Sequence, residues 1–171
     1  DQELDYVTVD FQSKIPNWII RKYSVQNLES LLDMGESPKL EYKLKIPRGA
    51  PEEFLESVSA FANTEGGKIL LGVDDNANVV GLEKNQTKRI EDLVSAHIEP
   101  EISVIITNVV IDEKKVTIVD IPEGSDKPYI LKNRGPYKRV GGTDKVFSRL
   151  DYEKLKPIYI EVTGPDDSGY Y

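Results

Sequence analysis

The sequence of 171 residues has no cysteine and a single histidine, His97. Without cysteine the chain can form neither a disulfide framework nor a zinc–thiolate site, and it has no thiol nucleophile. One histidine cannot supply a metal site built mainly from imidazoles. A metal ion bound by this chain would therefore need oxygen ligands, which favours Mg²⁺, Mn²⁺ or Ca²⁺.

Long hydrophobic runs are also missing. No segment reaches the roughly 18 consecutive apolar residues that a membrane span requires. Residues 1–10 are acidic and lack the basic-then-apolar pattern of a secretory signal peptide. We therefore predict an intracellular, cytoplasmic protein with no membrane partner.

Positive charge is scarce overall but concentrated in one segment. The net charge of −8 argues against a generally basic nucleic-acid binder. Residues 127–149, however, carry seven Lys or Arg against one Asp. Because salt screens charges more than about 10 Å apart, such a stripe can bind phosphates despite the acidic total. The alternative is an ordinary solvated hairpin.

Hydrophobic periodicity predicts one mixed α/β domain over residues 25–155, with an acidic N-terminal arm (1–24) and a C-terminal tail (156–171). The fold class is α+β, with a mixed sheet flanked by helices. Ser24 is predicted to cap a helix that ends near Gly35. The other predicted helices are 51–63, 88–98 and 150–155, and the main predicted strands are 39–46, 68–73, 102–111 and 115–121. Further short strands are expected at VVGL and on either side of residues 133–136.

Carboxylates gather near two of these strands. Alternation places Glu41 and Lys43 on one face of strand 39–46, with Glu36 just before it. Asp75 follows the end of the buried strand 68–73. Three such carboxylates can hold a hard cation that activates water beside a phosphate. The alternative, a solvated strand and an ordinary turn, stays open on spacing alone.

Three phrases in order, GESPKLEYK, SAFANTEGGKILLGVDDNANVVGL and PYKRVGG, resemble the Schlafen AlbA domain family over roughly residues 25–155. The resemblance implies a mixed α/β domain that in prokaryotes is commonly regarded as a DNA-binding or transcriptional-regulator module. In vertebrate Schlafen proteins two such lobes form a U-shaped core. Some of those cores are metal-dependent endoribonucleases that cut tRNA and rRNA with three carboxylates.

Where this sequence matches the family's motifs, the three catalytic acids correspond to Glu36, Glu41 and Asp75. The resemblance implies that these acids would hold Mg²⁺ or Mn²⁺ and that Lys43 would assist them. Tyr42 stands where the family usually has Phe. The basic phrase YKRVGG places Lys138 and Arg139 at the nucleic acid. The full set of predicted nucleic-acid contacts is Lys132, Arg134, Lys138 and Arg139.

Two features depart from a tRNA-cutting core, namely the acidic net charge and the presence of one lobe where the vertebrate cores have two. A homodimer would rebuild a two-lobed groove. Three functions follow as hypotheses: a metal-dependent endoribonuclease acting on structured RNA such as tRNA, a non-catalytic DNA- or RNA-binding regulatory module, and a protein-interaction module. The nuclease hypothesis favours RNA over DNA as the partner.

Overall fold

The computed structural model describes residues 17–155. The tail 156–171 and residues 1–16 of the predicted arm lie outside the described residues. The elements run in the order α1 (Asn17–Met34), β1 (Leu40–Lys43), α2 (Glu52–Asn63), β2 (Gly67–Leu71), α3 (Thr87–His97), β3 (Ile98–Glu99), β4 (Ile105–Ile111), β5 (Lys114–Ile121), β6 (Ile130–Leu131), β7 (Gly135–Val140), β8 (Thr143–Val146) and α4 (Arg149–Lys154).

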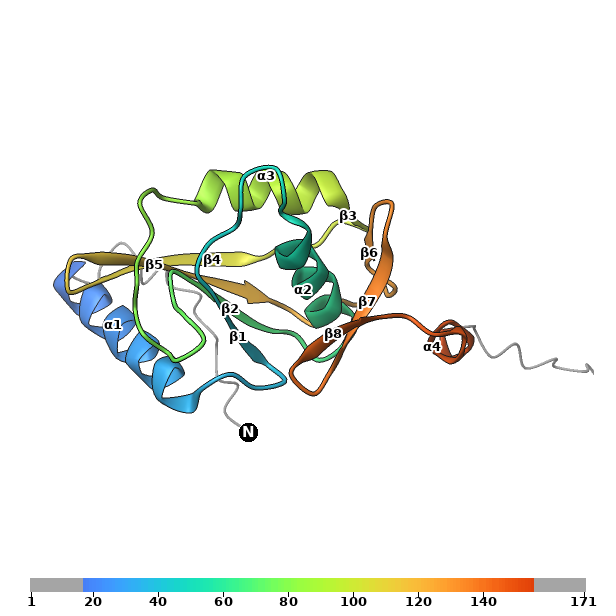
Figure 1. Cartoon of the computed structure of the whole chain (residues 1–171), viewed down its shortest axis with the longest axis horizontal. Coiled ribbons are helices and arrows are strands. Elements are labelled where there is room, and N and C mark those ends of the chain that lie inside the picture. Colours follow the sequence, from blue (N-terminus) through green and yellow to red (C-terminus); the bar gives the residue numbers. More distant parts are fainter. Residues whose placement is uncertain (1–16, 156–171) are drawn as a thin grey trace, which may run out of the picture.

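The first sheet has the strand order β1-β2-β5-β4 (Figure 1). β1 pairs with β2 in parallel, while β5 is antiparallel to β2 and β4. A parallel pair needs a crossover, and α2 supplies it. Ile69, Leu70 and Leu71 of β2 are fully buried. β2 is therefore covered on both sides, as its unbroken apolar run predicted.

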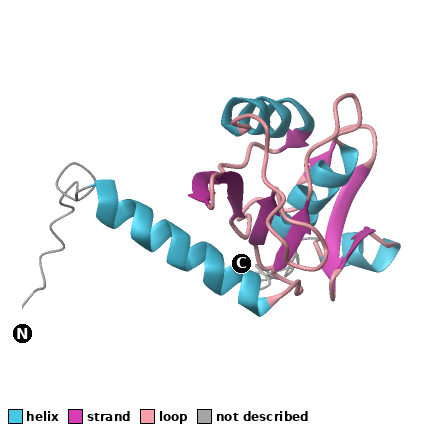
Figure 2. Ribbon diagram, turned by 60° about the vertical axis from the view of Figure 1, so that its left-hand side comes forward, coloured by secondary structure: helices cyan, strands magenta, loops and turns pink. Residues whose placement is uncertain are grey.

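Helices cover the two faces of this sheet. On one face Leu28 and Leu31 of α1 pack with Leu40, Tyr42 and Leu70. On the other face, residues of α2 and α3 enclose a second cluster. Figure 2 shows that the N-terminal part of α1 extends away from the sheet. Of the helices within residues 17–155, none combines the length and apolar character needed to cross a membrane.

The second sheet has the order β3-β6-β7-β8 and is antiparallel throughout. Polar side chains of α2 attach it to the rest of the domain. The Ser59 hydroxyl donates to the Tyr129 carbonyl (2.8 Å) and accepts from the Tyr137 amide (3.0 Å). The Asn63 side-chain amide donates to the carbonyls of both tyrosines and accepts from the Tyr129 N–H. Asn63 in the phrase AFANTEGG thus holds the second sheet against α2.

The α+β class predicted from periodicity is confirmed, and α2 and α3 begin and end within one residue of the predicted bounds. The details differ in several places. The structure has two sheets, where one mixed sheet was predicted. Ser24 lies inside α1 and does not cap it. Residues 79–82 form no strand beyond an isolated bridge between Val73 and Val79, while β3 and β8 were not predicted.

The pair Gly66-Gly67 sits where the chain passes from α2 to β2 with no room for side chains. Gly66 has a φ of +71°, and a Cβ there would lie 2.7 Å from the Ile121 carbonyl oxygen. A Cβ on Gly67 would lie 2.4 Å from the Phe61 ring. Both glycines are therefore required by close packing, and Gly66 also by its left-handed backbone.

We expect Gly66→Ala to lower the free energy of unfolding by about 1–3 kcal/mol, because the new methyl group meets backbone atoms that cannot move independently. Gly142→Ala is the matched control, since nothing lies within 4 Å of a Cβ at Gly142. Urea denaturation followed by circular dichroism measures both. Equal midpoints for the two variants would contradict this account of the helix-to-strand junction.

Candidate nucleic-acid interface

Glu41 lies between two cations on the α2 side of the first sheet. The Lys43 ammonium is 2.7 Å from Glu41 Oε1, and Arg139 Nη1 is 2.5 Å from Glu41 Oε2. The Glu41 side chain is only 14% exposed. The Ser57 hydroxyl, on α2, lies 3.3 Å from the same carboxylate. The face of β1 that carries Glu41 and Lys43 is therefore half-buried. It is not the solvated strand face that residue spacing alone left open as an alternative.

Arg139 is buried at the centre of this cluster, with 8% of its surface exposed. Nη1 also pairs with Asp144 at 2.7 Å, and Asp144 is the cross-strand partner of Arg139 in the β7–β8 ladder. Nε donates to the Pro38 carbonyl (3.2 Å), and the guanidinium stacks 4.7 Å from the Phe61 ring centre. The structure places this predicted phosphate contact inside the domain, where it joins β1, α2 and the second sheet.

Glu36 caps the outer edge of the first sheet. β1 is an edge strand, and Glu36 Oε1 accepts the Tyr42 N–H at 3.0 Å. This hydrogen bond satisfies a backbone donor that has no partner strand. The Tyr42 hydroxyl donates to the Leu31 carbonyl of α1 at 2.8 Å. Burial raises the pKa of Tyr42, and the nearby Glu36 charge raises it further.

Asp75 lies in the turn that follows β2, and its side chain is exposed. The preceding Asp74 forms the turn, because its carboxylate accepts the N–H groups of Asn76 (2.9 Å) and Asn78 (2.8 Å). Hydrogen bonds from the Asn78 side chain and backbone lower the pKa of Asp74. Asp74 has a clear structural role, while Asp75 has none that the structure explains.

In the described structure the three predicted metal ligands are not gathered into one metal-binding group. β1 and β2 are neighbours, as the prediction required. Across residues 17–155, however, no three Asp, Glu or His side chains stand close enough to hold a metal ion. Both oxygens of Glu41 face cations, and Glu36 faces a backbone amide. The site formed by Glu36, Glu41 and Asp75 stays a prediction.

Carboxylates from outside residues 127–149 pair with the predicted basic stripe. The three other predicted contacts form Lys132–Glu99 (2.9 Å), Arg134–Glu56 (2.8 Å) and Lys138–Asp151 (2.7 Å). The Lys132 and Arg134 pairs are partly exposed, and such pairs are typically worth about 0–1 kcal/mol, whereas the Asp151 side chain is only 11% exposed. A phosphate could therefore replace Glu99 or Glu56 at little cost to stability.

Lys138 and Lys145 lie directly opposite each other on β7 and β8. Because Arg139 faces α2, alternation puts both lysines on the outer face of the second sheet. Two like charges directly opposite each other destabilise a pair of antiparallel strands. Asp151 offsets the charge of Lys138 but not that of Lys145. The Lys138 and Ser148 side chains, both hydrogen-bonded to Asp151, hold its pKa well below the usual range, so this contact persists until the pH falls far below neutral.

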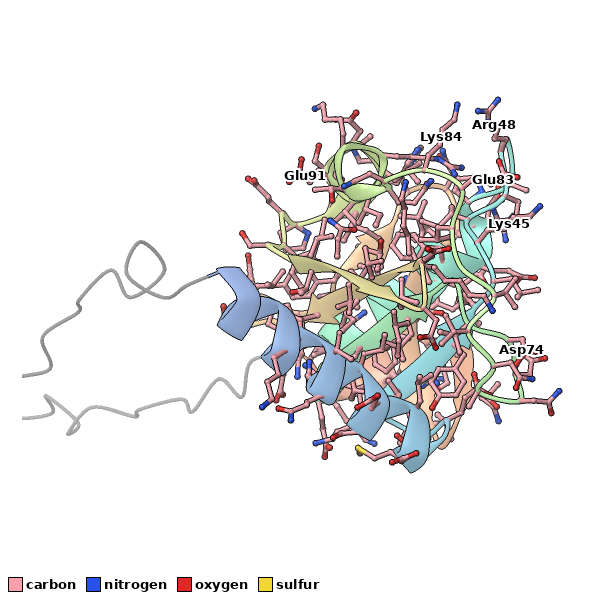
Figure 3. All side chains as sticks on the ribbon, turned by 90° about the vertical axis from the view of Figure 1, so that its left-hand side faces the viewer. Lys45, Arg48, Asp74, Glu83, Lys84 and Glu91 are labelled. Carbon is pink, nitrogen blue, oxygen red and sulfur yellow. The ribbon has the colours of Figure 1, made fainter. Side chains whose placement is uncertain are left out.

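A second basic surface was not predicted from the sequence. A groove of about 680 Å³ separates the segment after β1 from the segment leading into α3. Its charged lining residues are Lys45, Arg48, Lys84, Arg89 and a single acid, Glu83. Figure 3 shows the labelled Lys45, Arg48, Glu83 and Lys84 together at one corner of the molecule. These cations come from two segments that are well separated in the sequence, so no local run of charge indicates them.

We expect Glu41→Gln to lower the free energy of unfolding by about 1–3 kcal/mol, because it leaves the buried Arg139 guanidinium short of one counter-charge. Asp75→Asn, an equally small change at an exposed position, should alter stability by less than about 0.5 kcal/mol. Chemical denaturation of both variants without added metal tests this. A Glu41→Gln variant as stable as the wild type would show that the Glu41–Arg139 pair is not a structural tie.

Comparison with known proteins gives a family. The sequence model of the family described as "Schlafen, AlbA_2" matches residues 36–148, which is more than half of the chain. A search of curated proteins found no significant match. A crystal structure of a Corynebacterium diphtheriae protein, DIP2311, is 18% identical with a TM-score of 0.53, and the match covers 78% of this chain but only 28% of that one.

The solution structure of the N-terminal domain of a RecG-related protein from Nitrosomonas europaea is 25% identical with a TM-score of 0.48. That match covers 71% of this chain and 95% of the other. At these levels of identity and overlap, the Corynebacterium structure supports the fold alone. The family rests on the sequence match, which spans β1 to β8 and includes Glu36, Glu41, Asp75 and the β7–β8 hairpin. The chain belongs to the Schlafen AlbA_2 family.

Proposed function

We propose that this domain binds nucleic acid through phosphate contacts on the outer face of β7 and β8. The observation that carries the proposal is the cross-strand pair Lys138–Lys145, which concentrates two positive charges on an otherwise acidic chain. Lys145 is exposed, and it forms no ion pair with any residue of 17–155. A phosphodiester group would relieve the repulsion between the two ammonium groups.

Neighbouring cations extend the same surface. Lys132 and Arg134 are exposed, and each is paired with a single carboxylate at the protein surface. Exchange of these carboxylates for phosphates costs little, because exposed ion pairs contribute little to stability. Arg139 supports this surface from behind by holding β7 and β8 against α2. We include a preference for RNA over DNA, and a homodimer that joins two such surfaces, as parts of the proposal.

We expect the wild type to bind RNA with an affinity that falls steeply as salt rises, and Lys138→Gln/Lys145→Gln to weaken binding about tenfold or more, because the variant removes two cations that pair with phosphates. Fluorescence anisotropy with a labelled tRNA and a DNA duplex of equal mass measures affinity and the preference for RNA. Sedimentation of free and bound protein reports the homodimer.

Asp151→Asn separates a charge effect from a packing effect. This variant loosens the same contact between Lys138 and α4 as Lys138→Gln does, but it leaves the cation in place. If Lys138 binds phosphate, Asp151→Asn should bind nucleic acid as well as the wild type or better. Weaker binding by Asp151→Asn would mean that the hairpin's shape matters and its charge does not. No binding by the wild type at low salt would reject the proposed function.

Metal-dependent cleavage of RNA is a second candidate, and one observation favours it. β1 and β2 are parallel neighbours, so the end of the strand carrying Glu41 lies beside the chain leading to Asp75. For these acids to share Mg²⁺ or Mn²⁺, Glu41 would have to exchange Lys43 or Arg139 for the ion. A bound metal would supply an activated water and would offset phosphate charge.

This candidate predicts that Mn²⁺ raises the melting temperature of the wild type, because a ligand bound only to the folded state stabilises it. Asp75→Asn should lose both that shift and the cleavage of labelled tRNA while retaining RNA affinity. Asp75→Asn is the more informative variant, because Glu41 also stabilises the fold. A melting curve unchanged by Mn²⁺, together with cleavage that persists in EDTA, would reject the candidate.

A further inference from the structure

We infer that the groove between residues 44–48 and residues 80–89 binds a single strand of nucleic acid, separately from the β7–β8 surface. This inference rests on the proposed function, because it names a second place where the same ligand is held. No feature of the Glu36, Glu41 and Asp75 hypothesis involves the groove, since none of these acids lines it.

Charge distinguishes the groove from the rest of the surface. Four cations line it against one carboxylate, although the whole chain carries 22 basic and 30 acidic residues. Lys45, Arg48 and Lys84 are exposed, and none of them takes part in an ion pair formed within residues 17–155. The β6–β8 cations, by contrast, are mostly neutralised. Of the two basic surfaces, the groove therefore offers a polyanion the larger uncompensated positive charge.

Arg89 holds the two walls of the groove together. From α3, its Nη1 donates to the Ile46 carbonyl at 2.6 Å and its Nη2 to the Pro47 carbonyl at 2.7 Å. The opposite wall is fixed by backbone hydrogen bonds, from the Gly81 amide to the Gly72 carbonyl (2.8 Å) and from the Leu82 amide to the Lys115 carbonyl (2.8 Å). The groove is thus preformed, so little conformational entropy would be lost on binding.

Apolar side chains lie among the cations. Leu44 is 52% exposed and Val80 is 54% exposed, and both line the groove. A double helix presents mainly phosphates and sugars, and its bases are stacked inside. A single strand can place phosphates against the lysines and turn its bases or sugars onto Leu44 and Val80. A hollow with charged edges and apolar patches therefore suits a single strand better than a duplex.

The test compares two double variants that remove equal charge. Lys45→Gln/Lys84→Gln removes one cation from each wall of the groove. Lys22→Gln/Lys88→Gln removes two exposed cations that do not line it. Anisotropy with a labelled single-stranded RNA 12-mer should show affinity reduced about tenfold or more for the groove variant only. Its slope of log affinity against log salt should fall by about 1.4, or about 0.7 for each phosphate that no longer pairs with a lysine.

Two competition arms identify the ligand. A duplex of the same length should displace the strand less well than unlabelled single strand does. Inorganic phosphate should displace it no better than chloride at matched ionic strength. Competition by the duplex equal to that of the strand, or displacement by phosphate at low concentration, would overturn the assignment to a single strand.

The outcomes for the groove and for the proposed function are distinguishable. If the wild type binds RNA, and the groove and control variants bind it equally well, the groove inference fails while nucleic-acid binding stands. If the groove variant alone loses affinity and Lys138→Gln/Lys145→Gln does not, the groove is the main site and the β7–β8 assignment fails. If the wild type binds no nucleic acid, both fail.

Discussion

The buried guanidinium of Arg139 is the interaction on which the arrangement of this domain depends. It pairs with Glu41 from the first sheet and with Asp144 from β8, and it stacks on Phe61 of α2. A buried cation without these partners would be strongly destabilising, so the three elements must stay together. The backbone of the second sheet is fixed to α2 in a similar way by Ser59 and Asn63. The two sheets are thus joined through one helix by polar contacts as well as by the apolar core.

This dependence changes how the Glu-x-x-x-x-Glu-x-Lys phrase is interpreted. Glu36 closes the edge of β1, and Glu41 neutralises Arg139. Both acids therefore have structural roles that do not require a metal ion. Asp75 is different, because no structural contact explains it. A catalytic role for the three acids would need Glu41 to change partners, which makes Asp75 the residue that best separates a catalytic from a structural use of the phrase.

Local electrostatics, and not net charge, determine where a polyanion could bind. Six of the seven cations of the basic stripe in the sequence are paired with acids, among them acids from α2, β3 and α4. Only the Lys138–Lys145 pair keeps a surplus there. The larger surplus lies in the groove beside Arg89, where the lining cations come from two segments that the fold brings together. An acidic chain can in this way have two separate surfaces suited to phosphates.

The α+β class, the two helices α2 and α3 and the buried strand β2 could be predicted from the sequence. Hydrophobic periodicity is a local signal, so it can be interpreted without knowing distant contacts. Contacts between distant residues were needed to show that Arg139 is buried, that the basic stripe is mostly neutralised, and that Lys45 and Lys84 share a groove. Each of these outcomes depends on which distant side chains meet. The sequence pattern of a strand such as β1 indicates which residues share a face, but it does not indicate what packs against that face. The alternation correctly grouped Glu41 with Lys43 on one face of β1. Arg139 and Ser57, which cover that face, lie 98 and 16 positions from Glu41 in the sequence.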